Sequence, residues 1–508
     1  MPVSGGRLPQ CTPSGSYPRT VTTALDNPEK TTLGRNFAPL ERAHPKKSGY
    51  LLLSHGVDAL VARLKLMDAA QKTIDVQYYL YRFDIAGKMF TQKLLDAADR
   101  GVRVRLLLDD MEIDDNDFRF AVLGSHPNIQ VRFFNPFAGR SDLGRFWSVL
   151  VSFKRVNQRM HNKIFAVDNE VAIVGGRNIA DAYFSVDANP YFSDLDLLAV
   201  GPIVREVSAS FDDFWNSELA VPVSALVTRT PTEKDLKKFD NGLKKIWIKY
   251  KTHVYSKRLQ KSDFNKRIEN KALDLIWAPG RVLYDKPDRI LHNGRREDRL
   301  SFFGSALEPY FENTSKELLL ISPYLIPGKS GMALFRDLRR RGVKIRILTN
   351  SLAATDVAAV YGAYTDYRKA ILRMGIDLFE LKPNAKTEGV EAAHGSSVGA
   401  TLHAKTMVFD RTKVFVGSMN LDLRSVYDNT ELGLMVTSPQ LCERVVKLFG
   451  QMTSPESSLR LSLGEDGETI WPTLDNGREV RYDHAPYVSF WKILWSDLAG
   501  FLTPDSLL

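Results

Sequence analysis

Short apolar runs alternate with amphipathic segments over most of the chain. Runs rich in Val, Ile and Leu predict strands, and apolar residues at helical spacing predict the helices between them. The predicted strands span residues 73–80, 102–108, 129–134, 162–167, 171–175 and 195–201, then 317–322, 343–349, 376–381, 404–409, 413–417 and 432–437. The predicted helices include residues 57–70, 86–100 and 331–341. Near-continuous apolar strands separated by helices indicate a layered α/β fold.

The chain contains an internal duplication. Four segments recur in the same order about 242 residues later: RGVRVRLLLDD as RGVKIRILTNS, NIQVRFFNP as GIDLFELKP, MHNKIFAVDNEVAIVGGRN as LHAKTMVFDRTKVFVGSMN, and DLDLLAVG as TELGLMVT. We therefore expect two related lobes, each a mixed β-sheet flanked by helices, enclosing one pseudo-symmetric cleft. The expected boundaries are a flexible segment at 1–48, a first lobe at 49–225, a basic linker at 226–300, a second lobe at 301–452 and a tail at 453–508.

The charge is concentrated in the expected linker. Between Arg229 and Arg267 there are 13 Lys and Arg residues against four Asp and Glu, a surplus that equals the net charge of +9. This segment includes LKKIWIKYKTHVYSKR, in which aromatic residues alternate with lysines. Such a segment is either a solvated helical face or a surface for anionic lipid or nucleic acid, and the sequence leaves both open.

Composition excludes several classes of protein. With 44% hydrophobic and 25% charged residues, the chain is of globular rather than disordered type. The two cysteines are too few for a disulfide scaffold or a multi-thiolate zinc site. No apolar run reaches the roughly 18 residues of a transmembrane helix. The first 20 residues lack the apolar part of a signal peptide, so we expect either no export or a native start further upstream.

The two copies share the pattern His-x-Lys-x4-Asp-x6-Gly-[Gly/Ser]-x-Asn. A single His-x-Lys-x4-Asp match is weak, but two matches in register with a wider duplication are a strong signal. The predicted catalytic motifs are His161, Lys163 and Asp168 in the first copy, and His403, Lys405 and Asp410 in the second. The predicted substrate-binding residues are Gly176, Asn178, Ser418 and Asn420.

These residue types suit phosphoryl transfer without a metal ion. Carboxylates are too few for magnesium or calcium, and two histidines without thiolates fall short of a zinc site. Lysine and asparagine supply donors to a phosphoryl group, and the two histidines suit a nucleophile and a general acid. We predict no metal and no cofactor.

The carboxylates of the motif have different expected roles. Asp168 and Asp410 each end a strand before a short turn, so we expect them to be structural members of the site. A nucleophilic histidine needs its second ring nitrogen held, usually by a carboxylate. We predict Glu431 and its apparent repeat counterpart, Asp196, as these orienting groups.

The chain resembles the phospholipase D superfamily, whose members carry two His-Lys-Asp motifs in one bilobal site. Together, IDVQYYLYRFD, RMHNK, VGGRNIADAYF, FSDLDLLAVGPIV, LTNSLAATDVAAVYGAY, LHAK and VGSMNLDLRS are similar to bacterial cardiolipin synthases of the C-type. The resemblance implies metal-independent phosphatidyl transfer through a phosphohistidine. By the superfamily pattern, His161 is the nucleophile and His403 the acid, an assignment that the symmetry of the motifs does not itself fix.

The resemblance also implies partners and a location. It implies phospholipid substrates, namely phosphatidylglycerol and possibly phosphatidylethanolamine, and peripheral attachment to an anionic membrane surface, the cell inner membrane. Typical membrane-anchored cardiolipin synthases begin with two transmembrane helices, which this sequence lacks. Residues 486–502, apolar and rich in tryptophan, and residues 133–156 could each contact lipid or pack on the core.

Two other functions remain open. Water could replace the lipid acceptor, which would make the protein a phospholipase D. A nuclease is also possible, because superfamily members cleave DNA and the basic segment suits a nucleic-acid backbone. The interleaved aromatic residues favour lipid, so the leading hypothesis has no nucleic-acid partner.

Overall fold

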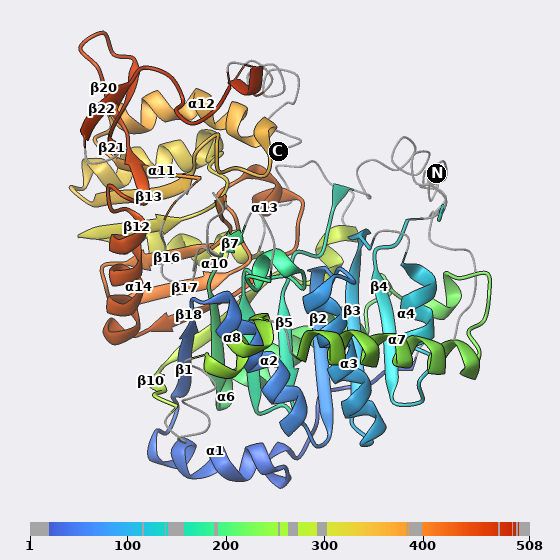
Figure 1. Cartoon of the computed structure of the whole chain (residues 1–508). Helices are drawn as coiled ribbons and strands as arrows, with labels where there is room; N and C mark the ends of the chain where they lie inside the picture. Colours follow the sequence, from blue (N-terminus) through green and yellow to red (C-terminus); the bar gives the residue numbers. More distant parts are fainter. Residues whose placement is uncertain are drawn as a thin grey trace, which may run out of the picture.

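The computed structural model describes residues 20–113, 116–137, 139–140, 157–186, 191–251, 254–262, 273–291, 302–383, 385, 399–475, 478–489, 491–493 and 496. These residues form two large sheets with helices on their faces, together with a two-stranded and a three-stranded sheet, and the two large sheets lie side by side in one body (Figure 1). The α/β architecture and the two lobes predicted from the sequence are confirmed.

The first sheet has nine strands, three of them parallel and adjacent. Strands β2, β3 and β4 pair in parallel, and all other neighbours pair antiparallel. The order is β10 (Ile276–Ala278), β1 (Ser48–Leu53), β8 (Asp196–Val200), β6 (Val171–Gly175), β5 (Ile164–Val167), β2 (Thr73–Leu80), β3 (Arg103–Glu112), β4 (Ile129–Phe134), β9 (Ala220–Pro222).

The second sheet repeats this arrangement with eight strands. Strands β12, β13 and β14 pair in parallel, with antiparallel strands on both sides. The order is β11 (Gly280–Tyr284), β18 (Leu432–Thr437), β17 (Lys413–Gly417), β16 (Thr406–Phe409), β12 (Glu317–Ile321), β13 (Lys344–Asn350), β14 (Asp377–Leu381), β19 (Ser458–Arg460). Every strand of this sheet has a counterpart at the equivalent position of the first sheet. The duplication seen in the sequence is therefore also present in the structure.

The helices cover the outer faces of both sheets and fill the space between them. Gly101 and Gly342 each end a helix with a positive φ, as the two RGV segments predict. The longer helices are α1 (Thr32–Ala43), α2 (Gly56–Ala69), α3 (Ile85–Asp99), α4 (Asp117–Leu123), α6 (Pro202–Trp215), α7 (Glu233–Lys251), α8 (Val254–Lys261), α10 (Phe302–Glu312), α11 (Gly328–Arg340), α12 (Ala358–Arg373), α13 (Leu423–Tyr427) and α14 (Pro439–Met452).

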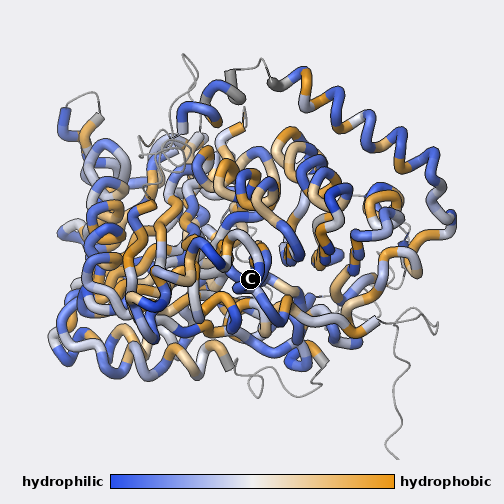
Figure 2. Tube along the Cα trace, turned by 90° about the horizontal axis from the view of Figure 1, so that it is seen from below, coloured by the Kyte–Doolittle hydropathy of each residue, from blue (hydrophilic) through white to orange (hydrophobic). Residues whose placement is uncertain are grey.

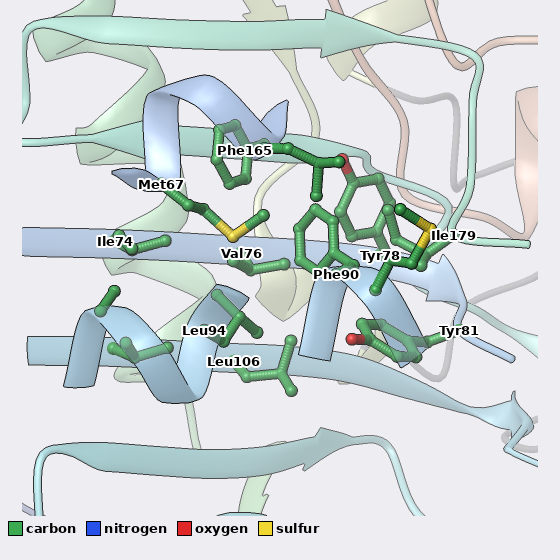
Figure 3. Close-up of a cluster of buried hydrophobic side chains, with 14 of the residues drawn as sticks. Met67, Ile74, Val76, Tyr78, Tyr81, Phe90, Leu94, Leu106, Phe165 and Ile179 are labelled. Carbon is green, nitrogen blue, oxygen red and sulfur yellow. The ribbon is translucent and has the colours of Figure 1, made fainter. Parts of the chain in front are cut away.

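The cores follow the same layers. Side chains of α2 and α3 pack on one face of the first sheet, where Met67, Phe90 and Leu94 meet Val76 and Leu106 (Figure 3). A second core is shared by the two lobes, because it joins residues of β5, β6 and β8 with residues of β16, β17 and β18. Hydrophobic residues gather in the interior and hydrophilic ones on the outer turns (Figure 2).

The expected domain boundaries require corrections. Residues 276–284 were assigned to the linker, yet they form edge strands, β10 in the first sheet and β11 in the second. Residues 28–43 were expected to be flexible, yet they form a 3-10 turn and α1. The start of the tail is likewise part of the fold, because β19 pairs with β14 and leads into a three-stranded sheet of β20 (Ser462–Leu463), β21 (Thr469–Asp475) and β22 (Arg478–Tyr482). Very short edge strands carry too little periodicity to be recognised in the sequence.

The two segments predicted to contact lipid lie largely outside the described residues. Of residues 133–156, the positions 138 and 141–156 are not described, and of residues 486–502, the positions 490, 494–495 and 497–502 are not. Where the structure is described, it contains no helix with the length and hydrophobicity needed to span a bilayer.

Candidate active site

Each His-x-Lys segment lies beside a segment of the opposite lobe. Met160 forms a parallel bridge with Thr430, and the His161 amide donates to the Thr430 carbonyl over 3.0 Å. In the other half, β7 (Tyr191–Ser193) pairs in parallel with β15 (Ala400–Leu402), and the His403 amide donates to the Ser193 carbonyl over 2.8 Å. The duplication therefore brings both motifs to the boundary between the lobes, as the sequence predicts.

This pairing places a carboxylate of one lobe on each histidine of the other. His161 Nδ1 lies 3.0 Å from Glu431 Oε2, and His403 Nδ1 lies 2.6 Å from Asp194 Oδ2. All four side chains are buried. A carboxylate on Nδ1 fixes the ring orientation and leaves Nε2 for reaction, and His403 Nε2 lies 3.4 Å from the Tyr183 hydroxyl.

The prediction that Asp196 orients a histidine is wrong. Its carboxylate lies 2.9 Å from Arg63 and 3.3 Å from Arg177, and it is bonded to neither His161 nor His403. Strand pairing shows the reason: Gly175 faces Asp196, whereas the equivalent Gly417 faces Gly433. The true counterpart of Glu431 is thus Asp194, two residues earlier in the D-L-D sequence. The sequence alignment of the repeat was shifted here, and only the sheet register reveals it.

Burial keeps both histidines neutral. It lowers the pKa of His161 to about 4, although Glu431 acts in the opposite direction. It also lowers the pKa of His403 to about 3, helped by the charge of Lys405 and opposed by Asp194. For Asp194, burial is outweighed by His403, Lys405 and Arg177, which hold its pKa at about 2. Asp194 is therefore a carboxylate, and each neutral ring can donate Nδ1–H to its partner.

The two lysines lie directly behind the histidines. Lys163 Nζ donates to the His161 carbonyl over 2.6 Å, and Lys405 Nζ donates to the His403 carbonyl. Burial lowers the pKa of Lys163 to about 7 and that of Lys405 to about 8. An anionic phosphoryl group would favour the charged form of both lysines.

The structure does not bring Asp168 and Asp410 to the histidines. Asp168 accepts bonds from the amides of Gln71, Lys72 and Thr73, at the start of β2. Asp410 accepts the equivalent bonds from residues 315–317, before β12. Both residues lie at the far ends of their strands and adopt positive φ. Asp168 and Asp410 therefore do not belong with the catalytic residues of the two motifs. Their contacts match the structural role that the sequence also predicts for them.

The Gly-[Gly/Ser]-x-Asn extensions lie against the carboxylates. A Cβ at Gly176 would overlap Asp194 Oδ1, whereas at the equivalent position Ser418 donates its hydroxyl to Glu431. Asn178 donates to Tyr183 Oη over 2.9 Å and accepts from the Leu80 amide. Asn178 and Asn420 both line the site, but only Asn420 keeps its amide oxygen without a partner among the described residues.

Both histidines open into one cavity of about 470 Å³ between the lobes. The part near His403 is aromatic, since Tyr183 and Phe192 pack on the ring with centroids 5.0 and 5.3 Å away. Tyr79 packs edge-on against His161. The sequence motif itself did not indicate several further lining residues: Tyr79, Arg82, Tyr183, Phe192, Tyr324, Asp356, Asp422, Arg424 and Asn429. Asp422 and Arg424 lie in the NLDLRS segment after the second motif, and Tyr183 lies in the NIADAYF segment after the first, so these segments could have suggested them.

Comparison with known proteins agrees with this geometry. The family described as "Cardiolipin synthase, PLD-like domain" matches residues 64–215 and 307–453. The chain is 38% identical to Cardiolipin synthase C of Escherichia coli (strain K12) over 92% of this chain and 98% of that protein. It is 26% identical to Cardiolipin synthase A of Pseudomonas aeruginosa over 75% of this chain and 62% of that protein.

A solved structure shows the same fold. The phosphatidylserine synthase of Haemophilus influenzae Rd KW20 superposes with a TM-score of 0.53 and 14% identity, over 84% of this chain and 91% of that one. The two family matches fall one on each lobe and include both histidine motifs. The chain therefore belongs to the cardiolipin synthase family of proteins with PLD-like domains.

Proposed function

We propose that this protein is a cardiolipin synthase that transfers a phosphatidyl group to the hydroxyl of phosphatidylglycerol. The observation that supports this most strongly is the pair of histidines, each held by a carboxylate of the opposite lobe, in one cavity. Family membership and the similarity to Cardiolipin synthase C over nearly the whole chain support the same activity.

The reaction proceeds in two displacements. His161 Nε2 attacks the phosphorus of the donor lipid, the P–N bond forms, and the P–O bond to the headgroup breaks. His403 gives the leaving oxygen a proton, which the negative charge of the bound phosphodiester favours on the ring. His403 then takes a proton from the acceptor hydroxyl, whose oxygen attacks phosphorus and breaks the P–N bond. Lys163, Lys405 and the Asn residues stabilise the phosphoryl oxygens without a metal ion.

The aromatic part of the cavity supports a lipid donor with an ammonium headgroup. Asp356 accepts from the Tyr324 hydroxyl, and Tyr183 and Phe192 line the same wall. Aromatic faces and a carboxyl group suit an ammonium headgroup. This environment supports phosphatidylethanolamine as a donor.

Helix α7 supports peripheral binding to an anionic membrane, the cell inner membrane. Its apolar face, including Phe239 and Trp247, packs on the first lobe. Its outer face exposes lysines and Ile248, which is 68% exposed. Phe239 of the inner face packs on Phe83, which follows the cavity residue Arg82.

The proposed function is tested with purified protein and labelled phosphatidylglycerol, with and without phosphatidylethanolamine. Cardiolipin is the expected product, and EDTA should have little effect. His161→Ala and His403→Ala should each reduce turnover by a factor of about a thousand or more. His484→Ala, at an exposed histidine outside the site, is the matched control and should leave turnover unchanged.

The alternatives give different products. Phosphatidic acid without cardiolipin would assign a phospholipase D, and DNA cleavage without lipid turnover would assign a nuclease. Trapping of labelled phosphohistidine in His403→Ala but not in His161→Ala would support His161 as the nucleophile, and the reverse result would exchange the two roles.

A further inference from the structure

Unpaired polar groups gather on the second-lobe wall of the cavity. Arg424 lines the cavity, forms no ion pair among the described residues and makes one long side-chain bond, 3.4 Å to the Asn157 carbonyl. Its buried Nε has no acceptor. Asn420 and Asn429 line the same wall, are 5% and 8% exposed, and leave their amide oxygens without a donor. A buried polar group left unpaired costs free energy, which a ligand can recover.

Among the described residues, the first-lobe positions equivalent to Arg424 and Asn420 carry no such unpaired group. The position equivalent to Arg424 is Ala182, and the equivalent of Asn420 is Asn178, whose amide is already bonded to Tyr183 and Leu80. The asymmetry shows that the unpaired set is not required by the repeated motif. The unpaired groups therefore indicate a ligand that binds in the second-lobe half of the cavity only.

The chemistry of the three groups specifies a ligand. A guanidinium with free N–H groups binds a phosphate, which it can contact through two bonds. Amide oxygens without donors bind hydroxyl groups. A molecule that carries one phosphodiester and neighbouring hydroxyls satisfies all three, and the headgroup of phosphatidylglycerol is such a molecule.

We propose that Arg424, Asn420 and Asn429 form a glycerophosphate subsite that binds the headgroup of the acceptor phospholipid. This inference rests on the proposed function. Arg424 holds the phosphodiester that does not react, and the amide oxygens accept from the glycerol hydroxyl that does not attack phosphorus. The attacking hydroxyl gives its proton to His403. The reacting phosphate remains between His161 and His403. The subsite thus selects a phospholipid acceptor over water or a free alcohol.

The test compares two acceptors, phosphatidylglycerol and free glycerol, of which only the first carries a phosphodiester. Mixed micelles of phosphatidylglycerol and phosphatidylethanolamine are incubated with labelled glycerol, and both cardiolipin and labelled phosphatidylglycerol are measured. Arg424→Gln should reduce cardiolipin formation about tenfold to a hundredfold at low phosphatidylglycerol, by raising the acceptor KM. Incorporation of free glycerol should not change, and Arg424→Lys should recover part of the loss.

Arg82→Gln, which changes the cavity arginine of the first lobe, is the matched variant. Equal losses with both acceptors in Arg424→Gln, or a selective loss in Arg82→Gln alone, would overturn the assignment of the subsite. Unchanged cardiolipin formation in Arg424→Gln would also overturn it. If the proposed function itself is wrong, the unmodified protein forms no cardiolipin, and this result is distinct from a failure of the subsite assignment.

Discussion

The carboxylates around the histidines divide into two groups with different tasks. Asp194 and Glu431 contact the rings directly, whereas Asp196 belongs to a buried ion pair with Arg63 and Arg177. The Arg177 guanidinium also donates to the carbonyls of Leu53 and Asp194, so it fixes the backbone that presents Asp194. Substitution of the two aspartates should therefore have separable effects.

Asp194→Asn should lower kcat roughly a hundredfold or more with little change in Tm, because the amide no longer stabilises the imidazolium of His403. Asp196→Asn should instead destabilise the fold by about 3–5 kcal/mol, because it leaves two buried arginines without their carboxylate. Turnover kinetics and thermal unfolding of both variants check this. A larger loss of kcat for Asp196→Asn than for Asp194→Asn, measured on folded protein, would contradict the assignment.

At the scale of elements, α7 is the clearest addition to the duplicated fold. It lies along the outside of the first lobe and packs on α3, and the described residues of the second lobe contain no counterpart (Figure 1). Lys237, Lys238 and Lys245 are exposed on its outer side. A solvated face and a membrane-binding face of this kind differ in how strongly they bind anionic vesicles.

Replacing Lys237, Lys238 and Lys245 together by Glu should weaken binding to vesicles rich in phosphatidylglycerol at least about a hundredfold, at about 1 kcal/mol for each lysine. Co-sedimentation at low and physiological salt measures this. Turnover of substrate in detergent micelles should stay unchanged. The matched control carries Glu at Lys316, Lys329 and Lys344, exposed lysines of the second lobe. Equal binding by both triple variants would leave α7 as a solvated face only.

At the scale of the whole molecule, the site exists only while the two lobes are joined. The shared core connects both sheets, and each histidine receives its carboxylate from across the boundary. Both histidines are consequently buried and neutral in the folded protein, with pKa values of about 4 and about 3 against 6.5 for an unperturbed imidazole. Unfolding exposes both rings to water.

The stability of the whole molecule should therefore fall as pH is lowered from about 6.5 towards 4. In this range the unfolded histidines bind protons and the folded ones do not, so protonation favours the unfolded state. Chemical denaturation at pH 7 and pH 5 measures the decline. Buried acids with raised pKa, such as Asp109 at about 6, act in the opposite direction, so the comparison must include a variant.

The double variant His161→Gln/His403→Gln lacks both groups and should show a smaller decline between pH 7 and pH 5. An identical decline in the variant and in the unmodified protein would show that the histidines do not contribute.

The sequence by itself determined the duplication, the central strands and the residues of the two motifs. These follow from local pattern: apolar periodicity marks buried strands, and His-x-Lys at one spacing in two copies marks a shared site. The boundaries of the expected linker were wrong because edge strands of three to six residues, such as β10 and β11, are specified by their neighbours in the sheet and not by their own pattern.

Only the tertiary structure decided which carboxylate holds which histidine. The sequence does not distinguish Asp194 from Asp196 as the partner of a histidine. In the structure Asp196 pairs with Gly175 in the first sheet, whereas Asp194 precedes β8 and its carboxylate contacts His403 of the other lobe. The cavity wall of Arg424 and Asn429 likewise depends on contacts between lobes. Local periodicity reports which face of an element is buried, but contacts between residues more than two hundred positions apart depend on sheet register and lobe packing, which no local pattern encodes.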